Sequence, residues 1–519
     1  MLEEHAELKT FYVTTAIDYV NARPHLGTAY EKIGADCLAR YKRLAGFDTY
    51  FLMGTDEHST NVEKEAHRLG KTPEVYCKEM AREFEEVWAK LNISYDQFIR
   101  TDDPQHKTAV QNLFRTVYNN GYIYQGTYEG YYCVSCEEFK LEKDLVDGLC
   151  PRHKEKATWL EEKNYFFALS KFSGRLKKHI EENREFIQPE TRRNEILGVI
   201  ERGLEDVSVS RKGVQWGVPL PSEIAEGHVV YVWFDALINY ISALGYSGAD
   251  DARFRKYWPA DCHVIGKDIT RFHCLIWPAM LMAADVPVAR SVFGHGFVYS
   301  RGTKMSKTIG NIMDPIELAE FLGSADSLRY LLLREIAFDR DGDFTIEQTV
   351  TRYNAELANE LGNLFSRTLS MLQRYRDGSV PTWTREAAID YDEIAGGVVD
   401  EYVNAMDQLS FDQAIVAWWK AVQSANRYIE QKKPWELSRA GDARALDDVL
   451  RALLEVLRLS SVLSIPFTPV KAEAMRRQLR LEPDISKVTL EEARSPGDDA
   501  WKGVDSPDPL FPKIETPAK

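Results

Sequence analysis

The sequence lacks several features that mark other classes of protein. No apolar run reaches the roughly 18–20 residues that a membrane-spanning helix needs. The N-terminus "MLEEHAELKTFYVTT" has no basic start followed by an apolar segment, so we expect no secretory signal. Cysteine is scarce and odd in number, with seven residues in 519, which argues against a disulfide framework. We therefore expect a cytoplasmic globular protein without repeats or low-complexity tracts.

Positive charge is in the minority. The chain has 65 Lys and Arg against 80 Asp and Glu, a net charge of −15. This balance argues against non-specific binding of nucleic acid, which depends on neutralising phosphates, although a local basic surface remains possible. At this length about two to four domains are expected.

The first sixty residues read as strand, helix and strand. "TFYVTTA" and "DTYFLMGTDEHS" are apolar strands, and between them Pro24 and Gly46 delimit a helix. Six residues at three- and four-residue spacing give this helix one apolar face: Leu26, Tyr30, Ile33, Cys37, Tyr41 and Leu44. Short connections of this kind indicate a parallel βαβ unit.

Three further regions follow. A polar, turn-rich insert occupies about 121–230, after which strands resume at "HVIGKDIT" and "SVFGHGFVYS". From about 330 the pattern is helical almost throughout, with Trp418 and Trp419 expected in its core. The last thirty residues, rich in Pro, Asp and Lys, predict a loosely docked tail.

Within the insert, "YYCVSCEEFKLEKDLVDGLCPRHK" contains two close pairs of metal-ligand residues. Cys133 and Cys136 form the first pair, and Cys150 and His153 the second. The spacing predicts a tetrahedral Cys3His zinc site with a structural role, whose metal would supply folding energy to a polar segment. The alternative is four unrelated residues in a loop.

Two segments suit the binding of a polyphosphate. "PHLGT" lies where the first strand turns into the first helix, so unpaired N–H groups favour an anion there. Gly27 permits close approach to the backbone and His25 adds a donor. In "RGTKMSKTIGN", Lys304 and Lys307 can close over phosphates as charge develops. Taken singly, these segments could be a helix cap and a solvated surface loop.

Together, "HLGT" and "KMSKT" resemble the HIGH and KMSKS signatures of the class I aminoacyl-tRNA synthetases. The chain is most similar to the methionyl branch, through "TTAIDYVNARPHLG", "GTDEHS", "YVWFDALINYI", "GKDITRFHCLIWPAML", "GNLFSR" and "NRYIEQKKPWE". The single zinc motif resembles the one-zinc form. Thr28 stands where the family has a second histidine, and Thr308 replaces the last serine.

The resemblance implies a methionine–tRNA ligase that serves translation initiation and elongation. L-methionine and Mg-ATP would give methionyl-adenylate, and the methionyl group would pass to the 3′-terminal adenosine of initiator or elongator tRNA. The implied ATP site comprises His25, Gly27, Thr28, Lys304 and Lys307. The implied methionine site comprises Ala16, Ile17, Tyr19, Asp56, Trp233, Ala236, Tyr240, Ile269 and His273, with Leu237 in its wall and Asp268 facing it.

The implied catalytic residues are His25, Lys304, Lys307 and Asp56, the last as ligand of the substrate ammonium. Asp56 could instead cap the next helix, and "YVWFDALINYI" could be a core helix without any ligand. Because no convincing nucleophile–base arrangement is present, positioning and charge stabilisation would dominate.

The implied fold is a Rossmann-like parallel-sheet catalytic domain (1–120 and 231–300) with an inserted zinc-knuckle domain (121–230). A loop and stem-contact region (301–345) and an α-helical anticodon-binding domain with its tail (346–519) follow. Asn363, Arg367 and Trp435 would bind the anticodon, since an aromatic plane beside an amide and a guanidinium suits unstacked bases. We expect a monomer, because no appended tRNA-binding module follows.

Three alternatives remain at this point. A cysteinyl-tRNA synthetase would need zinc ligands from the catalytic sheet instead of a self-contained knuckle. A nucleotidyltransferase of related fold would usually be shorter and lack the helical domain. A non-enzymatic zinc-ribbon RNA-binding module would leave the paired phosphate-binding segments unexplained.

Overall fold

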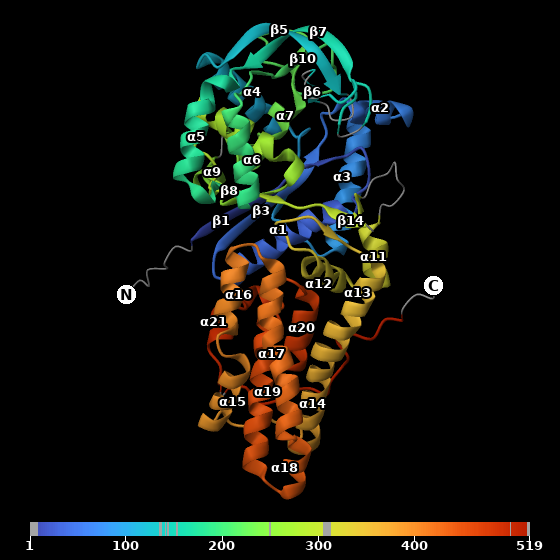
Figure 1. Cartoon of the computed structure of the whole chain (residues 1–519), viewed down its shortest axis with the longest axis vertical. Helices are drawn as coiled ribbons and strands as arrows, with labels where there is room; N and C mark the ends of the chain where they lie inside the picture. Colours follow the sequence, from blue (N-terminus) through green and yellow to red (C-terminus); the bar gives the residue numbers. More distant parts are fainter. Residues whose placement is uncertain are drawn as a thin grey trace.

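The structure, a computed structural model, describes residues 9–133, 138–140, 142, 145–151, 154–248, 251–300, 302–304, 313–498 and 500–515. The molecule is elongated, with an α/β half at one end of its long axis and a helical half at the other (Figure 1). Among the described residues, no helix has the length and apolar character needed to cross a membrane.

The α/β half is built on one parallel sheet. Its strands are β1 (Thr10–Thr15), β2 (Asp18–Tyr19), β3 (Asp48–Asp56), β4 (Gln97–Arg100), β8 (Ile187–Gln188), β12 (Cys262–Gly266) and β13 (Val292–His295). The order is β2-β3-β1-β12-β13-β8, with β4 also paired to β3. In the centre, Val13 lies opposite Phe51 on one side and Cys262 on the other. The predicted Rossmann-like parallel sheet is thereby confirmed.

Helices cover both faces of this sheet. α1 (Leu26–Leu44) and α3 (Pro73–Lys90) pack on one face, with α2 (Thr60–Arg68) nearby, and α4 (Pro104–Asn119) and α10 (Trp277–Ala283) pack on the other. The predicted apolar face of α1 is buried as expected, from Leu26 to Leu44. The chain leaves this helix at Gly46, whose φ of 85° lies in the left-handed region that glycine tolerates.

The insert forms an antiparallel sheet at the far end of the α/β half (Figure 1). Its order is β6 (Glu138–Lys140), β5 (Ile123–Cys133), β7 (Thr158–Phe167) and β9 (Val207–Ser208), and β10 (Ser210–Lys212) pairs with β11 (His228–Val230). Two helices, α5 (Ser173–Glu182) and α6 (Glu190–Glu201), belong to the same stretch. β8 lies between them in sequence but pairs with β13 of the main sheet, so the stretch predicted as an insert also supplies a sheet strand.

A short connecting region joins the two halves. It contains β14 (Val298–Ser300), β15 (Thr303–Lys304), α11 (Pro315–Phe321), α12 (Ala325–Glu335) and β16 (Gly342–Asp343). The helical half comprises α13 (Ile346–Arg352), a π-helical segment (Tyr353–Gly362), α14 (Asn363–Arg376), α15 (Arg385–Ala395), α16 (Val398–Asp407), α17 (Phe411–Lys432), α18 (Pro434–Ala440), α19 (Ala443–Leu463), α20 (Pro469–Gln478) and α21 (Leu490–Arg494).

The central helix α19 is buried on nearly every side, and its charged side chains are paired inside the core. Arg451 and Arg458 each form an ion pair with the fully buried Glu455, at 2.8 and 2.6 Å. Buried ions require such pairing, because an isolated charge inside a protein is strongly destabilising. Trp418 and Trp419 of α17 are also buried, so their predicted core role is confirmed.

The prediction of a loosely docked C-terminal tail was wrong. Trp501, Val504 and Phe511 are all buried, and the Trp501 Nε1 donates to the Leu479 carbonyl at 2.7 Å. These anchors are widely spaced among polar residues, so the composition of the segment conceals them.

One cluster of buried apolar side chains is continuous between the two halves. It begins at β1 with Val13, passes through α1 and α12, and includes the core of the bundle as far as Phe511. The halves are therefore packed as one body and not joined by a bare linker.

Candidate active site

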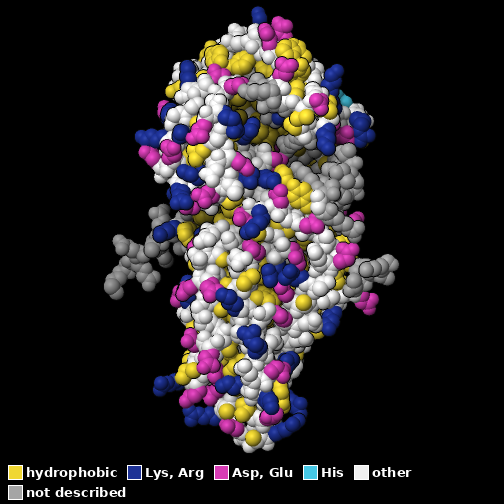
Figure 2. Space-filling model, in the orientation of Figure 1, with side chains coloured by type: hydrophobic (Ala, Val, Ile, Leu, Met, Phe, Trp, Pro, Cys, Tyr) yellow, Lys and Arg dark blue, Asp and Glu magenta, His cyan; other side chains and the backbone are white. Residues whose placement is uncertain are grey.

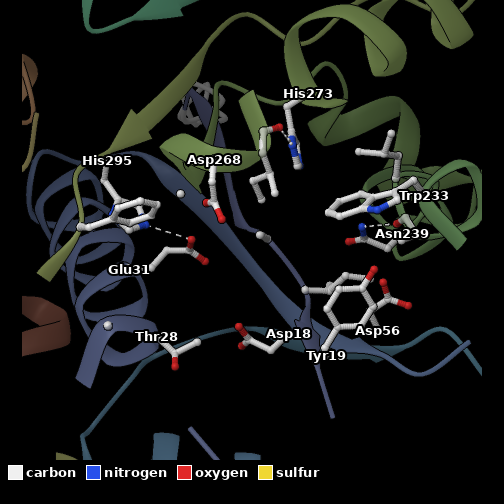
Figure 3. Close-up of a pocket in the computed structure, with 18 of the residues that line it drawn as sticks. Asp18, Tyr19, Thr28, Glu31, Asp56, Trp233, Asn239, Asp268, His273 and His295 are labelled. Atoms are coloured by element: carbon white, nitrogen blue, oxygen red, sulfur yellow. Dashed lines mark hydrogen bonds and ion pairs between the residues drawn. The ribbon is translucent and has the colours of Figure 1, made fainter. Parts of the chain in front are cut away.

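A cavity of about 480 Å³ opens at the carboxyl ends of β1, β3, β12 and β13. The chain proceeds from β1 to β3 on one side and later returns to β12 on the other, so the cavity lies where the strand order reverses. Ligands bind at this topological switch point in open α/β sheets. Figure 3 shows Glu31, Asp268 and His295 on one side of the cavity and Asp56, Trp233 and Asn239 on the other.

Every predicted pocket residue in the described part of the sheet and its neighbouring helices lines this cavity. The set is Ala16, Ile17, Tyr19, His25, Gly27, Thr28, Asp56, Trp233, Ala236, Leu237, Tyr240, Asp268, Ile269 and His273. They come from five separate segments (16–19, 25–28, 56, 233–240 and 268–273), and the fold brings them together.

The start of α1 is organised by a reciprocal cap. The Thr28 N–H donates to His25 Nδ1 at 3.2 Å, and the His25 N–H donates to Thr28 Oγ1 at 3.0 Å. Because Nδ1 accepts, a neutral His25 ring carries its proton on Nε2, which remains a donor. A Cβ on Gly27 would lie 2.9 Å from the His25 ring. Glycine therefore makes room for the histidine itself.

The predicted cationic loop, 301–311, is described only at residues 302–304. Lys304 ends β15, whose backbone pairs with Tyr299, and Lys307 lies outside the described residues. Met313, which follows the loop in the chain, accepts a hydrogen bond on its carbonyl from the Leu26 N–H at 3.1 Å, in the first turn of α1.

The apolar end of the cavity has aromatic walls. Trp233 of α7 (Val232–Ala236) stacks on Phe272 with ring centroids 3.8 Å apart and planes inclined by 12°. Tyr19 meets the Trp233 ring edge-on at 6.2 Å. Phe272, which was not predicted, packs on the Trp233 ring and does not itself line this cavity.

His273 is a neutral acceptor in this wall. Its Nδ1 lies 3.1 Å from the Ile269 carbonyl, which can only accept, so the proton resides on Nδ1. Its Nε2 lies 2.7 Å from the Tyr240 hydroxyl, which therefore donates to it. Burial lowers the pKa of His273 to about 4, so the ring stays uncharged at neutral pH.

Two buried polar atoms at this end have no partner among the described residues. They are Trp233 Nε1 and Asn239 Oδ1. Asn239, in α8 (Asn239–Ser242), donates its amide to the Ala236 carbonyl at 2.6 Å, which directs its oxygen away from that bond. Orphaned polar atoms in a cavity wall are typical of a site that a ligand completes.

The opposite end contains a charged cluster that the sequence analysis missed. The fully buried Lys32 ammonium contacts Glu31 at 2.6 Å, Asp18 at 3.0 Å and the Ala16 carbonyl at 2.8 Å. His295 contacts the other Glu31 oxygen at 3.0 Å. Burial raises the pKa of Asp18, whereas Lys32 and His295 overcome burial and lower that of Glu31. This end therefore combines two carboxylates with the Lys32 ammonium and the His295 ring.

Behind the cavity, two histidines bracket one buried carboxylate. Asp235 of α7 contacts His58 Nδ1 at 2.6 Å and His106 Nε2 at 2.8 Å. Burial disfavours a charged His58, but Asp235 more than offsets this and raises its pKa to about 9. Since His58 lies two residues after Asp56, this ion pair ties the end of β3 to the helix that carries Trp233.

The predicted zinc ligands are only partly described. Cys133 and Cys150 are buried and pack against each other in a small separate cluster. Cys136 and His153 lie outside the described residues. Within the part of the chain that the structure describes, no three His, Cys, Asp or Glu side chains gather as a metal site would require.

The predicted anticodon residues lie in the helical half, at a distance from the cavity. Asn363 and Arg367 are exposed one turn apart on α14, and Arg367 pairs with Glu430 in the last turn of α17 at 2.7 Å. Trp435 follows that turn, half-buried at the start of α18. Lys and Arg side chains flank this tip of the molecule (Figures 1 and 2).

Comparisons with known proteins agree with this arrangement. Residues 11–159 and 152–369 match the family described as tRNA synthetases class I (M), and residues 382–518 match the anticodon binding domain of methionyl tRNA ligase. The methionine–tRNA ligase of Caldanaerobacter subterraneus subsp. tengcongensis is 45% identical over 92% of this chain and 75% of its own length. That of Thermotoga maritima is 42% identical over 97% and 80%.

Solved structures give the same result. Mycobacterium tuberculosis methionyl-tRNA synthetase in complex with methionyl-adenylate superimposes with a TM-score of 0.92 at 40% identity, covering 97% of this chain and 100% of that one. The free form of the same enzyme gives a TM-score of 0.86 at 38% identity, covering 99% and 100%. The similarity thus extends over both halves of the molecule.

Proposed function

The chain belongs to the methionyl-tRNA synthetases of class I, and from this premise we propose a role for each part of the cavity. The protein is an aminoacyl-tRNA ligase that joins methionine to tRNA, with methionine, ATP and tRNA as its partners. The observation that carries the assignment of roles is one cavity, with one apolar and one charged end, at the switch point of the sheet.

We propose that methionine binds at the aromatic end. Trp233 and Tyr19 would contact its apolar chain, whose flexibility and weakly polar sulfur suit such walls, and Phe272 would support the Trp233 ring. Asp56, at the end of β3, would bind the α-ammonium group, and the unpartnered Asn239 Oδ1 could accept from it as well. A neutral His273 keeps this end free of positive charge.

ATP would occupy the other end, with its phosphates at the first turn of α1. The His25 Nε2–H and the helix N-terminus are donors there, and Lys304 and Lys307 would stabilise the pyrophosphate as it leaves. Because Glu31, Asp18 and Asp268 would repel a bare triphosphate, we propose that ATP enters with Mg²⁺, which neutralises phosphate charge.

In the first step, the methionine carboxylate attacks the α-phosphate, an O–P bond forms and pyrophosphate departs. In the second, a hydroxyl of the terminal tRNA adenosine attacks the acyl carbon and AMP departs. No side chain needs to form a covalent bond, so this chain contributes by holding the reactants in line and stabilising charge. We propose that it acts as a cytoplasmic monomer, since one chain supplies all the residues named.

Amino-acid-dependent exchange of pyrophosphate into ATP, measured with each of the twenty amino acids, tests this function. Exchange is expected with methionine. Exchange with cysteine instead, or with no amino acid, would contradict the assignment of the cavity.

Asp56→Asn should raise the KM for methionine by about 10- to 150-fold, because one charge-assisted hydrogen bond contributes about 1.5–3 kcal/mol. The KM for ATP should change little. Asp268→Asn, at the nucleotide end, is the matched control and should change the KM for ATP instead. Equal effects of both variants on both substrates would contradict the proposed polarity of the cavity.

We also propose one structural zinc ion held by Cys133, Cys136, Cys150 and His153. The burial of Cys133 against Cys150 supports this, because these cysteines lie 17 positions apart in a largely polar segment and still meet. Thiolates and an imidazole are the ligands that zinc prefers in tetrahedral sites.

Metal analysis of the purified protein should find one zinc per chain. Cys150→Ala should lose the metal and render the insert more sensitive to protease, since metal binding and local folding are coupled. Cys274→Ala, which removes a buried cysteine from another part of the core, should retain it. Loss of zinc from neither variant, or from both, would contradict the assignment.

A further inference from the structure

The two halves are connected by α12, which buries several polar side chains in its first half. Arg329 and Asp326 lie one turn apart on this helix, and both have at most 1% of their surface exposed. Neither residue lines the cavity. Burying charge in this way is unfavourable unless each group is paired, so their partners show what the helix holds together.

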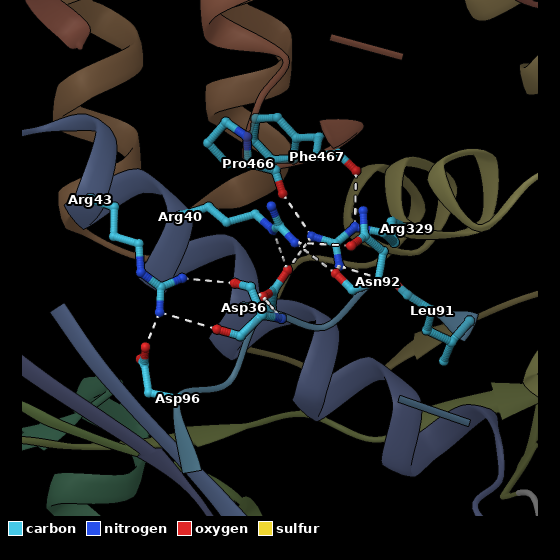
Figure 4. Close-up of polar contacts among 10 residues, drawn as sticks. Asp36, Arg40, Arg43, Leu91, Asn92, Asp96, Arg329, Pro466 and Phe467 are labelled. Atoms are coloured by element: carbon cyan, nitrogen blue, oxygen red, sulfur yellow. Dashed lines mark hydrogen bonds and ion pairs between the residues drawn. The ribbon is translucent and has the colours of Figure 1, made fainter. Parts of the chain in front are cut away.

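Arg329 is bonded to three segments at once (Figure 4). Its guanidinium contacts the Asp36 carboxylate of α1 at 2.6 Å. It donates to the Leu91 and Asn92 carbonyls after α3, both at 3.4 Å. It also donates to the carbonyls of Pro466 and Phe467, at 2.9 and 3.2 Å, in the turn between α19 and α20.

The partner of Arg329 in the catalytic half is itself firmly held. Asp36 accepts from the Ser94 N–H and hydroxyl, both at 2.6 Å, and from Arg40 at 2.7 Å. Although burial alone would raise it, Arg40 and Arg329 hold the pKa of Asp36 well below its usual range. The carboxylate is therefore a fixed point on α1, the helix that begins at His25.

Asp326 binds the other side of the same turn. Its Oδ2 accepts from the Lys471 N–H in the first turn of α20 at 2.7 Å. The carboxylate thus caps a helix N-terminus from another helix, which suits the positive end of the α20 dipole. Arg329 on the carbonyls and Asp326 on the N–H form a polar clamp, defined here as these two residues on the α19–α20 turn.

The polar clamp lies at one end of the long helix α19. α19 has 21 residues and spans about 30 Å at about 1.5 Å per residue. Its other end adjoins α18, where Trp435 lies. A tilt of about 10° at the clamp would move that end by about 5 Å over this length. Misplacements of about 1 Å can already lower a rate about 100-fold.

We propose that Arg329 and Asp326 are positioning residues for the transfer step. They fix the angle between the helical half and the catalytic sheet, so that a tRNA held at the α18 tip presents its other end to the cavity. This rests on the proposed function, because it requires tRNA to contact both halves. The clamp contributes to the rate of transfer and not to adenylate formation, which takes place in the catalytic half alone.

Asp326→Ala and Asp326→Asn form a matched pair, because asparagine retains an acceptor for the Lys471 N–H and alanine does not. We expect Asp326→Ala and Arg329→Lys to slow single-turnover transfer from preformed adenylate to tRNA by about tenfold or more. The KM for tRNA and the rate of pyrophosphate exchange should stay within about threefold. Asp326→Asn should behave like the wild type.

A surface control separates the clamp from other contacts between the halves. Lys42→Met removes the ion pair with Asp407, which also joins the two halves but whose carboxylate is half-exposed. Such pairs contribute about 0–1 kcal/mol, so all three measurements should be unchanged. Thermal unfolding identifies any variant that fails to fold. If Arg329→Lys fails to fold, Asp326→Ala alone carries the test.

Parallel losses in exchange and transfer would overturn the proposal, because the clamp would then act through α1 on the phosphate site. A higher KM for tRNA with an unchanged transfer rate would also overturn it, as would an Asp326→Asn variant as defective as Asp326→Ala. The pyrophosphate-exchange assay of the wild-type protein contains no tRNA. It therefore tests the proposed function independently of the clamp.

Discussion

His25→Ala is expected to lower methionine-dependent pyrophosphate exchange by about 100- to 1000-fold. The substitution removes the Nε2–H donor from the first turn of α1, where phosphate charge must be stabilised as pyrophosphate leaves. Loss of one preorganised donor of this kind typically costs a factor of about 100–1000. Methionine binding, measured by equilibrium dialysis without ATP, should change by less than about threefold, since His25 lies away from the aromatic walls.

The same substitution also removes a helix cap, which by itself costs about 0.5–2 kcal/mol of stability. His25→Asn is the control for this second effect, because asparagine can accept from the Thr28 N–H but is too short to replace Nε2. We expect it to restore the melting temperature and not the activity. Recovery of both would reduce His25 to a capping residue.

Trp435→Ala is expected to lower the charging of tRNA by up to about 100-fold while leaving pyrophosphate exchange unchanged. Stacking of one base on an aromatic side chain contributes about 1–3 kcal/mol, and Trp435 is half-buried at the exposed tip beside α17 and α18. The loss should appear mainly in the KM for tRNA. In this it differs from the clamp variants, which should slow transfer at nearly unchanged KM.

Because part of the Trp435 ring packs against the bundle core, a structural effect must be separated from loss of stacking. Trp435→Phe keeps an apolar body and a smaller aromatic plane, and should give an intermediate loss with a wild-type melting temperature. Equal losses of charging and exchange in Trp435→Ala would show that the residue supports the fold instead.

The sequence predicted the residues of the cavity that lie at strand ends or beside a recognisable signature. Asp56, Asp268 and the His25 segment belong to this group, because short apolar runs that end in polar residues locate the carboxyl ends of buried strands. Trp233 and Tyr240 were predicted from the resemblance alone. The alternative of a core helix explains part of their burial, since Trp233 also packs on Phe272.

The charged end could not be predicted in this way. Glu31 and Lys32 follow the signature directly, but charged residues in an amphipathic helix normally indicate its solvent face. Their burial depends on Asp18 of β2 and His295 of β13, whose proximity to α1 is decided by the tertiary structure. Asn239 was hidden for a similar reason, because only the tertiary structure leaves its oxygen without a partner among the described residues.

Strand β8 shows a different limit. Ile187 and Gln188 make a strand of two residues, too short for any periodicity, and the pairing with β13 is decided by packing. In the sequence, Arg329 and Asp326 look like the solvent-facing polar side of an ordinary helix, because only tertiary packing brings their partners to them. Partners that are more than 130 positions away along the chain are needed to give these two residues a role.

The continuous apolar core has a consequence for how substitutions act on this enzyme. Because buried side chains from β1 to Phe511 belong to one cluster, unfolding of the helical half would expose apolar surface on the α1 face of the catalytic half. A destabilising change deep in the helical half therefore lowers the population of folded active sites, even though it touches no substrate. Tolerance to mutation is thus a property of the whole chain, and the helical half limits how far the catalytic half can vary.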